Sequence, residues 1–168
     1  MLPIAHSYYS LRYGTMPVEE LVERAVQSGL KRLVLADINN TSGIPDFVKA
    51  CRQAGITPVA GMDIFDGNRR LYTLVARSAK GFREINDFAS ACHTGGLPYP
   101  PEAPPMEEVW VLYPPGSPGF GLQHENAFLG VTPRERSRIA WSPYKKLTGR
   151  MAGVRYLSFA DAEGYEIG

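Results

Sequence analysis

Three short segments place polar side chains that can do metal chemistry within or directly after apolar runs. The segments are residues 4–10, residues 35–40 and residues 61–65. They offer the imidazole of His6 and the carboxylates of Asp37 and Asp63. Each apolar run is typical of a buried strand, and we expect the strand ends to direct these groups towards one common rim. Imidazole and carboxylate groups that converge in this way are ligands for divalent metal ions, which activate water.

The order and spacing of these segments resemble the polymerase-and-histidinol-phosphatase (PHP) domain that opens the alpha subunit of bacterial DNA polymerase III. In that family the segments read approximately His-x-His-Ser-x-Tyr-Ser, Thr-Asp-His-Gly-Asn and Gly-x-Glu-Val-Tyr. Here Ile4 stands where the first histidine belongs and Ile38 where the third belongs. Asp63 stands where the glutamate belongs. The scaffold therefore resembles the family, while several of the family's metal ligands are replaced.

The resemblance is dense from Ile4 to about Phe88. Residues 13–22 and residues 36–48 are similar to a divergent branch of these alpha subunits. That branch also has an asparagine-rich loop in place of the Asp-His-Gly-Asn element. Beyond Pro98 only the order of the predicted strands supports the resemblance.

The resemblance implies a site where His, Asp and Glu side chains hold a cluster of divalent metals that binds phosphate oxygens. By position, further ligand sites of the family fall on Tyr13 and, more loosely, on Tyr156 and Ser158. These side chains do not replace the family's acidic and imidazole ligands. Three candidate ligands therefore remain, namely His6, Asp37 and Asp63. Three ligands are too few to hold a metal cluster against competition from water. We expect no catalytic residue and no cofactor here; a single Zn or Mn ion, if bound, would use those three groups.

A second interpretation of the same residues needs no metal. Asp37 precedes a loop, residues 38–43, that is typical of side chains satisfying free backbone N–H groups before a helix. We expect His6 to hydrogen-bond that loop across the barrel mouth and Asp63 to serve the neighbouring turn. The other rim residues are Ser7, Asn39 and Asn40. We favour this interpretation, in which the polar groups are retained for loop geometry.

Apolar residues recur at strand and helix spacing, and turn-forming residues separate these segments. This pattern predicts an α/β chain. After an opening strand, strands are predicted at residues 33–36, 57–65, 71–76, 109–113, 127–131 and 151–159. Helices are predicted at residues 15–29, at residues 44–55, from about Phe82 to Gly95, and, as a basic helix, from residue 132 to about residue 146. About seven strands separated by helices imply a PHP-type distorted barrel of mostly parallel strands surrounded by helices. We expect a single domain over residues 1–168, excised from the N-terminal part of a much longer polymerase chain.

Local signals refine this expectation. Thr15 is a suitable N-cap for the first helix. Residues 66–68, Asp-Gly-Asn, indicate a tight turn, after which the strand at residues 71–76 either pairs antiparallel or splays away. The proline-rich residues 97–105 predict an extended connector.

Composition excludes several classes of protein. The 168 residues are 44% hydrophobic and 21% charged, with 18 Lys and Arg against 17 Asp and Glu, so the net charge is +1. This balance carries no signature of a domain that grips nucleic acid by itself. No signal peptide or membrane-length apolar run is present in the sequence. The two cysteines, Cys51 and Cys92, lie on apolar helix faces, which indicates free buried thiols in a reducing cytoplasm.

The resemblance implies that the parent chain is a DNA-directed DNA polymerase, a nucleotidyltransferase that uses Mg and contacts DNA. This segment itself is expected to be inactive, serving as a structural and docking platform. Its implied partners are the other domains of the alpha subunit and the proofreading exonuclease subunit, with no membrane. The alternatives are a working metal-dependent phosphoesterase or proofreading 3′–5′ exonuclease, and a free-standing binding domain of unrelated function.

Overall fold

The computed structural model describes residues 2–11, 13–117, 125–135 and 151–156. The named strands of this described part are β1 (Leu2–Ala5), β2 (Arg32–Leu35), β3 (Thr57–Asp66), β4 (Arg69–Ala76), β5 (Val109–Tyr113), β6 (Ala127–Val131) and β7 (Met151–Tyr156). Its named helices are α1 (Val18–Gln27), α2 (Ile44–Ala54) and α3 (Ala79–Gly95). The strands and helices fall where the apolar periodicity predicts them.

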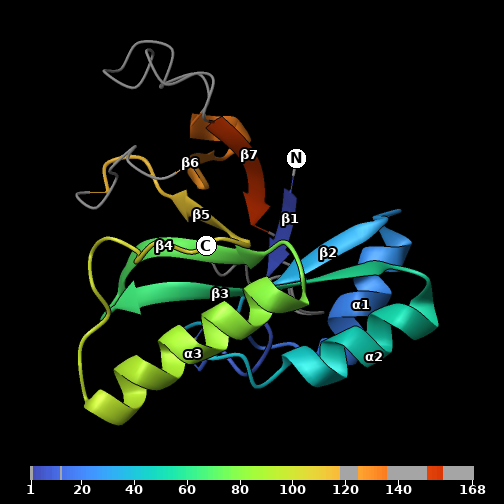
Figure 1. The fold of residues 1–168 in the computed structure, drawn as a ribbon. Coiled ribbons are helices and arrows are strands. Elements are labelled where there is room, and N and C mark those ends of the chain that lie inside the picture. Colours follow the sequence, from blue (N-terminus) through green and yellow to red (C-terminus); the bar gives the residue numbers. More distant parts are fainter. Residues whose placement is uncertain (1, 12, 118–124, 136–150, 157–168) are drawn as a thin grey trace.

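The strands form a closed barrel in chain order, in which β1 pairs with both β2 and β7 (Figure 1). β4 pairs antiparallel with β3 and β5, and every other pair of neighbours is parallel. The turn at residues 66–69 therefore makes a hairpin, which resolves the two alternatives left open by the sequence. The expected distorted barrel of mostly parallel strands is confirmed.

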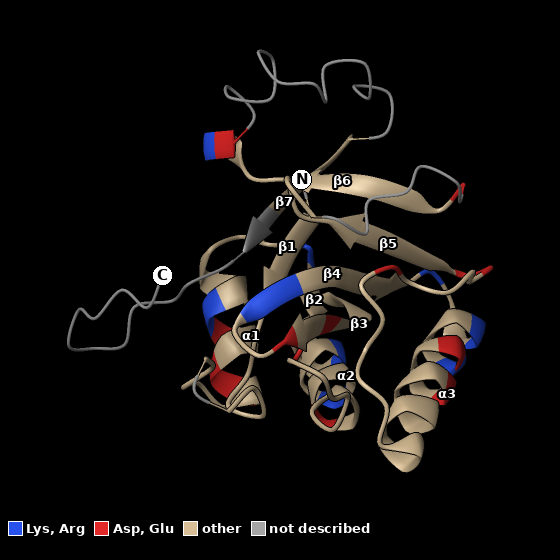
Figure 2. Cartoon of the chain, turned by 90° about the vertical axis from the view of Figure 1, so that its left-hand side faces the viewer, with Lys and Arg blue, Asp and Glu red and all other residues tan. Residues whose placement is uncertain are grey.

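Two apolar layers and a filled lumen hold the barrel together. The lumen is packed with Ile4, Val34, Ala36, Val75, Leu112 and Val154. α1 and α2 cover the outer face beside β2, while α3 packs beneath β3, β4 and β5 (Figures 1 and 2). Because side chains alternate along a strand, β3 sends Met62 and Ile64 outward to α3 and turns Asp63 towards the lumen side. The alternation of side chains along β3 thus positions Asp63, the central residue of the candidate site.

The start of the first helix differs from the expectation. α1 begins at Val18, directly after Pro17, and Thr15 does not cap it. The carbonyl of Pro17 accepts the first helical hydrogen bond, from the N–H of Leu21 at 3.0 Å. Proline fixes the backbone at that position, so the helix starts there without a side-chain cap. The helix ends are as expected, with Gly29 and Gly55 at φ of 69° and 71°.

The second half follows the expected order as far as it is described. The connector at residues 97–105 is neither helix nor strand. The carboxylate of Glu135 accepts the N–H and hydroxyl of Thr132, a capping contact at the start of the expected basic helix. The rest of that helix, and residues 157–159 of the expected last strand, lie outside the described residues.

Two further observations concern the cysteines and the character of the helices. Cys51 and Cys92 are buried and free, as expected, and burial raises the pKa of the Cys51 thiol to about 11. Among the described residues, no helix combines the length and apolar character that crossing a bilayer requires.

The close approach of β3 to β4 gives a test of the barrel. Gly61→Ala is expected to lower the free energy of unfolding by roughly 1–3 kcal/mol, because overpacking against fixed backbone is costly. An added Cβ would lie 2.7 Å from the Leu74 carbonyl oxygen. Gly130→Ala on β6 is the control, since its nearest contact would be an ordinary 3.4 Å to the Leu112 side chain. Urea denaturation measures both; equal stabilities would contradict the tight approach.

Candidate functional site

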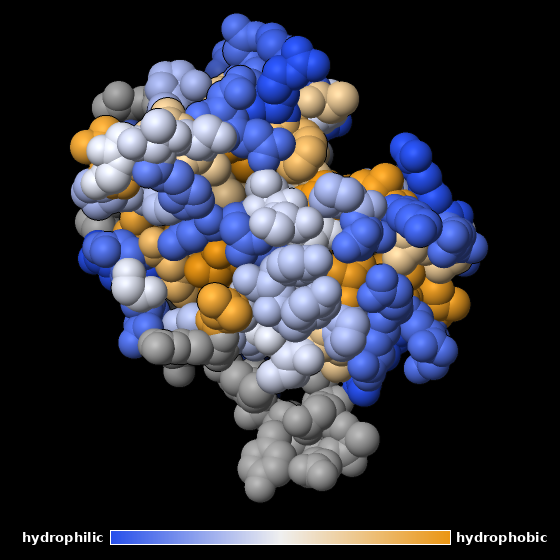
Figure 3. All heavy atoms as spheres, turned by 90° about the horizontal axis from the view of Figure 1, so that it is seen from below, coloured by the Kyte–Doolittle hydropathy of each residue, from blue (hydrophilic) through white to orange (hydrophobic). Residues whose placement is uncertain are grey.

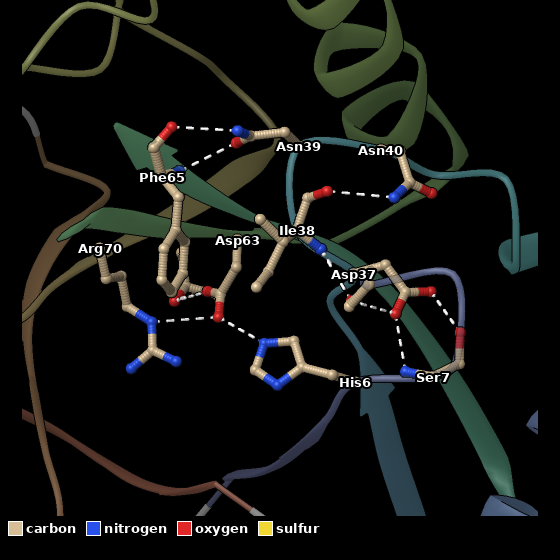
Figure 4. A network of polar contacts seen from close by, with 11 residues as sticks. His6, Ser7, Asp37, Ile38, Asn39, Asn40, Asp63, Phe65 and Arg70 are labelled. Carbon is tan, nitrogen blue, oxygen red and sulfur yellow. Dashed lines mark hydrogen bonds and ion pairs between the residues drawn. The ribbon is translucent and has the colours of Figure 1, made fainter. Parts of the chain in front are cut away.

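The backbone itself brings the three sequence-predicted residues to one edge of the barrel. The Ala36 N–H donates to the Ala5 carbonyl at 3.0 Å, so β1 and β2 stay paired to their ends. Beyond β2, the Asp63 N–H donates to the Asp37 carbonyl at 3.1 Å, and an isolated parallel bridge joins Ile38 to Asp63. His6, Asp37 and Asp63 therefore lie at the same end of the barrel, where the His6 and Asp63 side chains bond each other and that of Asp37 bonds the loop after β1 (Figure 4).

Asp63 is the fully buried centre of a polar cluster. Its Oδ2 accepts from His6 Nε2 at 2.7 Å and from Arg70 Nε at 3.1 Å (Figure 4). Its Oδ1 accepts the hydroxyl of Thr73. The Asp63 side chain has no exposed area, while His6 and Arg70 keep 16% and 25% of theirs. Because an ionised carboxylate only accepts hydrogen bonds, His6 Nε2 carries the proton of its bond.

The charge of Asp63 is stabilised by its surroundings despite burial. Burial by itself raises the pKa of the Asp63 carboxyl. The Arg70 guanidinium, the His6 imidazole and the threonine hydroxyl outweigh that effect and hold the pKa below its usual value. The group is therefore an ionised carboxylate matched by a permanent cation from the same hairpin.

Asp37 is satisfied in a different way, by neutral donors. Its Oδ1 accepts the Ser7 N–H at 2.7 Å and the Ser10 hydroxyl at 2.6 Å, and its Oδ2 accepts the Ser7 hydroxyl at 2.7 Å. Ser10 Oγ in turn accepts the N–H of Ile38 at 3.0 Å. Asp37 is 1% exposed. It ties the loop after β1 to the loop after β2.

The two asparagines after Asp37 organise the neighbouring backbone. Asn39 adopts a left-handed φ of 54°, a conformation that asparagine tolerates better than most residues. Its side chain donates to the Phe65 carbonyl at 3.0 Å and accepts the Phe65 N–H at 2.9 Å. Asn40 donates to the carbonyls of Tyr9 and Ile38 at 3.1 and 3.0 Å. Their predicted role in loop geometry agrees with these contacts.

Ile4, Ile38 and Tyr13, among the remaining predicted positions, contribute no polar side chain to the Asp63 cluster. Ile4 is fully buried in the barrel lumen, and Ile38 is partly exposed beside the Asp63 backbone. Tyr13 packs edge-on against Phe65, with ring centroids 5.5 Å apart. The backbone of Tyr156 pairs with β1 opposite Ile4. Ser158 lies outside the described residues.

The donor set does not fit the metal cluster that the fold suggests. Within the described ranges, no three His, Cys, Asp or Glu side chains gather closely enough to hold an ion. His6 and Asp63 already bind each other, and Figure 4 draws Ile38 between Asp63 and the Asp37 carboxylate. Both oxygens of each carboxylate accept hydrogen bonds from within the chain. A metal would have to displace these donors rather than join them.

Three residues of the site escaped the sequence-based expectation, namely Arg70, Thr73 and Ser10. Arg70 and Thr73 lie on β4, which the tight-turn signal places beside β3. A simple hairpin register, counted from the turn, puts Tyr72 opposite Asp63. A bulge between Ile64 and Phe65 shifts the register so that Thr73 takes that place. The turn signal alone could have placed an arginine of β4 near the site, but not the correct threonine.

Comparison with known families places this site in context. The family described as PHP domain matches residues 5–114, which contain the mouth cluster from His6 to Thr73. An error-prone DNA polymerase of Symbiobacterium thermophilum is 34% identical over 94 residues, which cover 55% of this chain and 9% of that protein. A DNA polymerase III subunit alpha of Neisseria meningitidis is 29% identical over 96 residues, 54% of this chain and 8% of that protein. The chain thus spans less than a tenth of the length of these relatives.

A two-domain protein of Bacteroides vulgatus, described as containing a predicted PHP-like metal-dependent phosphoesterase, is similar with a TM-score of 0.46 and 14% identity. The similarity covers 91% of this chain and 42% of that one.

Removal of the Asp37 carboxylate is expected to loosen the mouth. Asp37→Ala leaves buried serine donors without an acceptor, which predicts a loss of roughly 2–5 kcal/mol in the free energy of unfolding. Asp87→Ala on the exposed face of α3 removes the same charge and is expected to change stability little. Thermal and urea unfolding of both variants test this. A tolerated Asp37→Ala would contradict the structural role of that carboxylate.

Proposed function

The chain belongs to the PHP domain family, and we propose that it is the N-terminal PHP domain of a replicative DNA polymerase III alpha subunit. In this proposal the domain is catalytically silent. It serves as a structural platform for the other domains of the polymerase and as a docking surface for the proofreading exonuclease subunit. The DNA, the Mg ions and the nucleotidyl transfer belong to the parent polymerase, which acts in the cytoplasm.

The relatives support the polymerase assignment. The error-prone polymerase and the DNA polymerase III alpha subunits match 54% to 57% of this chain, and the family match covers residues 5–114. Proteins with these names are 26% to 34% identical to this chain over the matched residues. A segment that matches 8% to 10% of each relative is the size of one domain of such a polymerase.

One observation carries the proposed inactivity. The oxygens of Asp37 and Asp63 accept hydrogen bonds from within the chain; the donors to Asp37 are neutral, and those to Asp63 include the Arg70 guanidinium. A hydrolytic metal site needs ligands with free electron pairs and an open coordination position for water. The described side chains gather no set of three His, Cys, Asp or Glu ligands at the mouth, and each carboxylate oxygen there already accepts at least one hydrogen bond.

The surface supports a role in contacts with protein rather than in an independent grip on DNA. Acidic and basic residues are interspersed along the helices of the described part (Figure 2). Figure 3 views the molecule from below relative to Figure 1. The face that it shows is mostly hydrophilic, with apolar patches separated by polar side chains. A domain that binds DNA alone would show a continuous basic stripe. Mixed polar surfaces with small apolar patches are typical of contacts between domains of one chain.

The metal content of the purified protein tests the proposed inactivity. We expect zinc, manganese and iron far below one mole per mole of protein, because no open ligand set is present at the mouth. Hydrolysis of bis-p-nitrophenyl phosphate with added Mn or Zn is expected to match the buffer blank. Elemental analysis and absorbance measure the two quantities.

The rival function predicts the opposite result. A working phosphoesterase would hold more than one metal per molecule and would lose turnover in a His6→Ala variant. A variant with an exposed histidine removed, His93→Ala, is the matched control, since His93 is far along the chain at the end of α3. Metal-dependent turnover that survives His93→Ala and is lost in His6→Ala would overturn the proposed inactivity.

The complete reading frame tests the polymerase assignment. We expect the native gene to continue beyond Gly168 into the polymerase domains, and its full product to extend a primed DNA template with Mg. Residues 1–168 alone are expected to add no nucleotide, because the catalytic carboxylates of the parent lie elsewhere. Primer extension on a sequencing gel measures both proteins. A native gene that ends near Gly168 would favour a free-standing binding domain instead.

A further inference from the structure

The mouth of the barrel contains a buried charge pair where the fold family suggests a metal. We propose that Arg70 supplies, from within the chain, the positive charge that a divalent ion supplies in metal-dependent members of this fold. The mouth is then closed by an ion pair built into the β3–β4 hairpin. The inference concerns the source of positive charge at the site and does not rest on the identity of the parent protein.

The first argument is the burial of the carboxylate. Asp63 has no exposed side-chain area, and an isolated buried carboxylate is far more costly than a paired one. Its Oδ2 accepts from Arg70 Nε at 3.1 Å. Its other partners are the neutral hydroxyl of Thr73 and the His6 imidazole, which bonds the same Oδ2. Arginine carries a permanent charge, and the Arg70 charge is the largest of the effects that hold the pKa of the Asp63 carboxyl down.

The second argument is the way in which the guanidinium is held. Arg70 lies over the ring of Phe65, with its Cζ 5.3 Å from the ring centroid. The backbone of Phe65 is clamped by both ends of the Asn39 amide, and its ring contacts Tyr13. A cation between an aromatic face and a carboxylate is favoured at both contacts. The arginine is therefore positioned by the rim loops and is not a loosely attached surface residue.

The third argument is competition for the same oxygen atom. A metal bound by His6 and Asp63 would need Asp63 Oδ2, which already accepts from both His6 and Arg70. It would also stand beside a guanidinium that cannot lose its proton. Repulsion between the two cations would oppose binding. The same residue thus both stabilises the carboxylate and excludes a divalent ion from it.

The test is a double-mutant cycle at positions 63 and 70. Arg70→Met keeps most of the side-chain length and removes the charge. We expect it to raise the unfolding equilibrium constant by roughly tenfold or more, because it leaves a buried carboxylate unmatched. In the Asp63→Asn background the same substitution is expected to cost far less, since no charge remains to be matched. Urea unfolding of the four proteins gives the coupling.

Two further variants separate charge from packing. Arg69→Met is the matched control, because Arg69 is 60% exposed and its partner Asp66 is 65% exposed. Arg70→Lys is expected to keep more of the stability than Arg70→Met, since it retains the charge. If Arg70→Lys is as unstable as Arg70→Met, shape rather than charge is responsible and the inference fails.

Metal dependence completes the experiment. The melting temperature of the wild-type protein is expected to be unchanged by EDTA and by added Zn or Mn. A fall with EDTA would overturn the inference, as would equal losses for Arg70→Met in both backgrounds. These outcomes differ from those that test the proposed function. Failure of the full-length protein to extend primers would remove the polymerase role while leaving the coupling between Asp63 and Arg70 intact.

Discussion

A carboxylate with no access to water must be matched inside the protein, and Asp63 imposes this constraint on the whole barrel mouth. It requires a cation, which Arg70 provides, and donors for its remaining lone pairs, which come from His6 and Thr73. Arg70 and Thr73 reach it because β4 runs antiparallel to β3, whereas the neighbouring strand pairs of the described barrel that do not include β4 are parallel. A parallel strand in that place would require a long crossover connection after β3. The antiparallel direction of β4 therefore both allows a short hairpin after β3 and brings partners to the charge of Asp63.

The asparagine that follows the second strand supports the neighbouring hairpin. Phe65 pairs with Arg70 beside the bulge, and the Asn39 amide bonds both the N–H and the carbonyl of Phe65. A buried N–H or carbonyl left without a partner costs about 1–3 kcal/mol. The clamp therefore stabilises β3 next to the register shift that places Thr73, rather than Tyr72, opposite the carboxylate.

The sequence allowed most of the fold to be predicted, because strands, helices and turns are marked by strong local signals. The run 33–36, the glycines after the helices and the Asp-Gly-Asn turn each correspond to an observed element. The convergence of His6, Asp37 and Asp63 was also predictable, since it follows from parallel strand ends. The partners of Asp63 were not predictable in full, because a one-residue bulge reverses which face a strand residue occupies. Thr15 failed as a helix cap because Pro17 set the start of the helix.

The lumen, the aspartate and the arginine are parts of one physical arrangement. Ile4 of β1, two residues before His6, contributes hydrocarbon to the core of the lumen. A carboxylate beside that core that holds no cation is a buried charge that destabilises the fold. There are two ways to relieve this: remove the acid or add a cation. The chain has an acid at Asp63 and, beside it, the guanidinium of Arg70, which is held against the Phe65 ring. The aspartate and the arginine are therefore interdependent, and either one alone would be less stable than the pair.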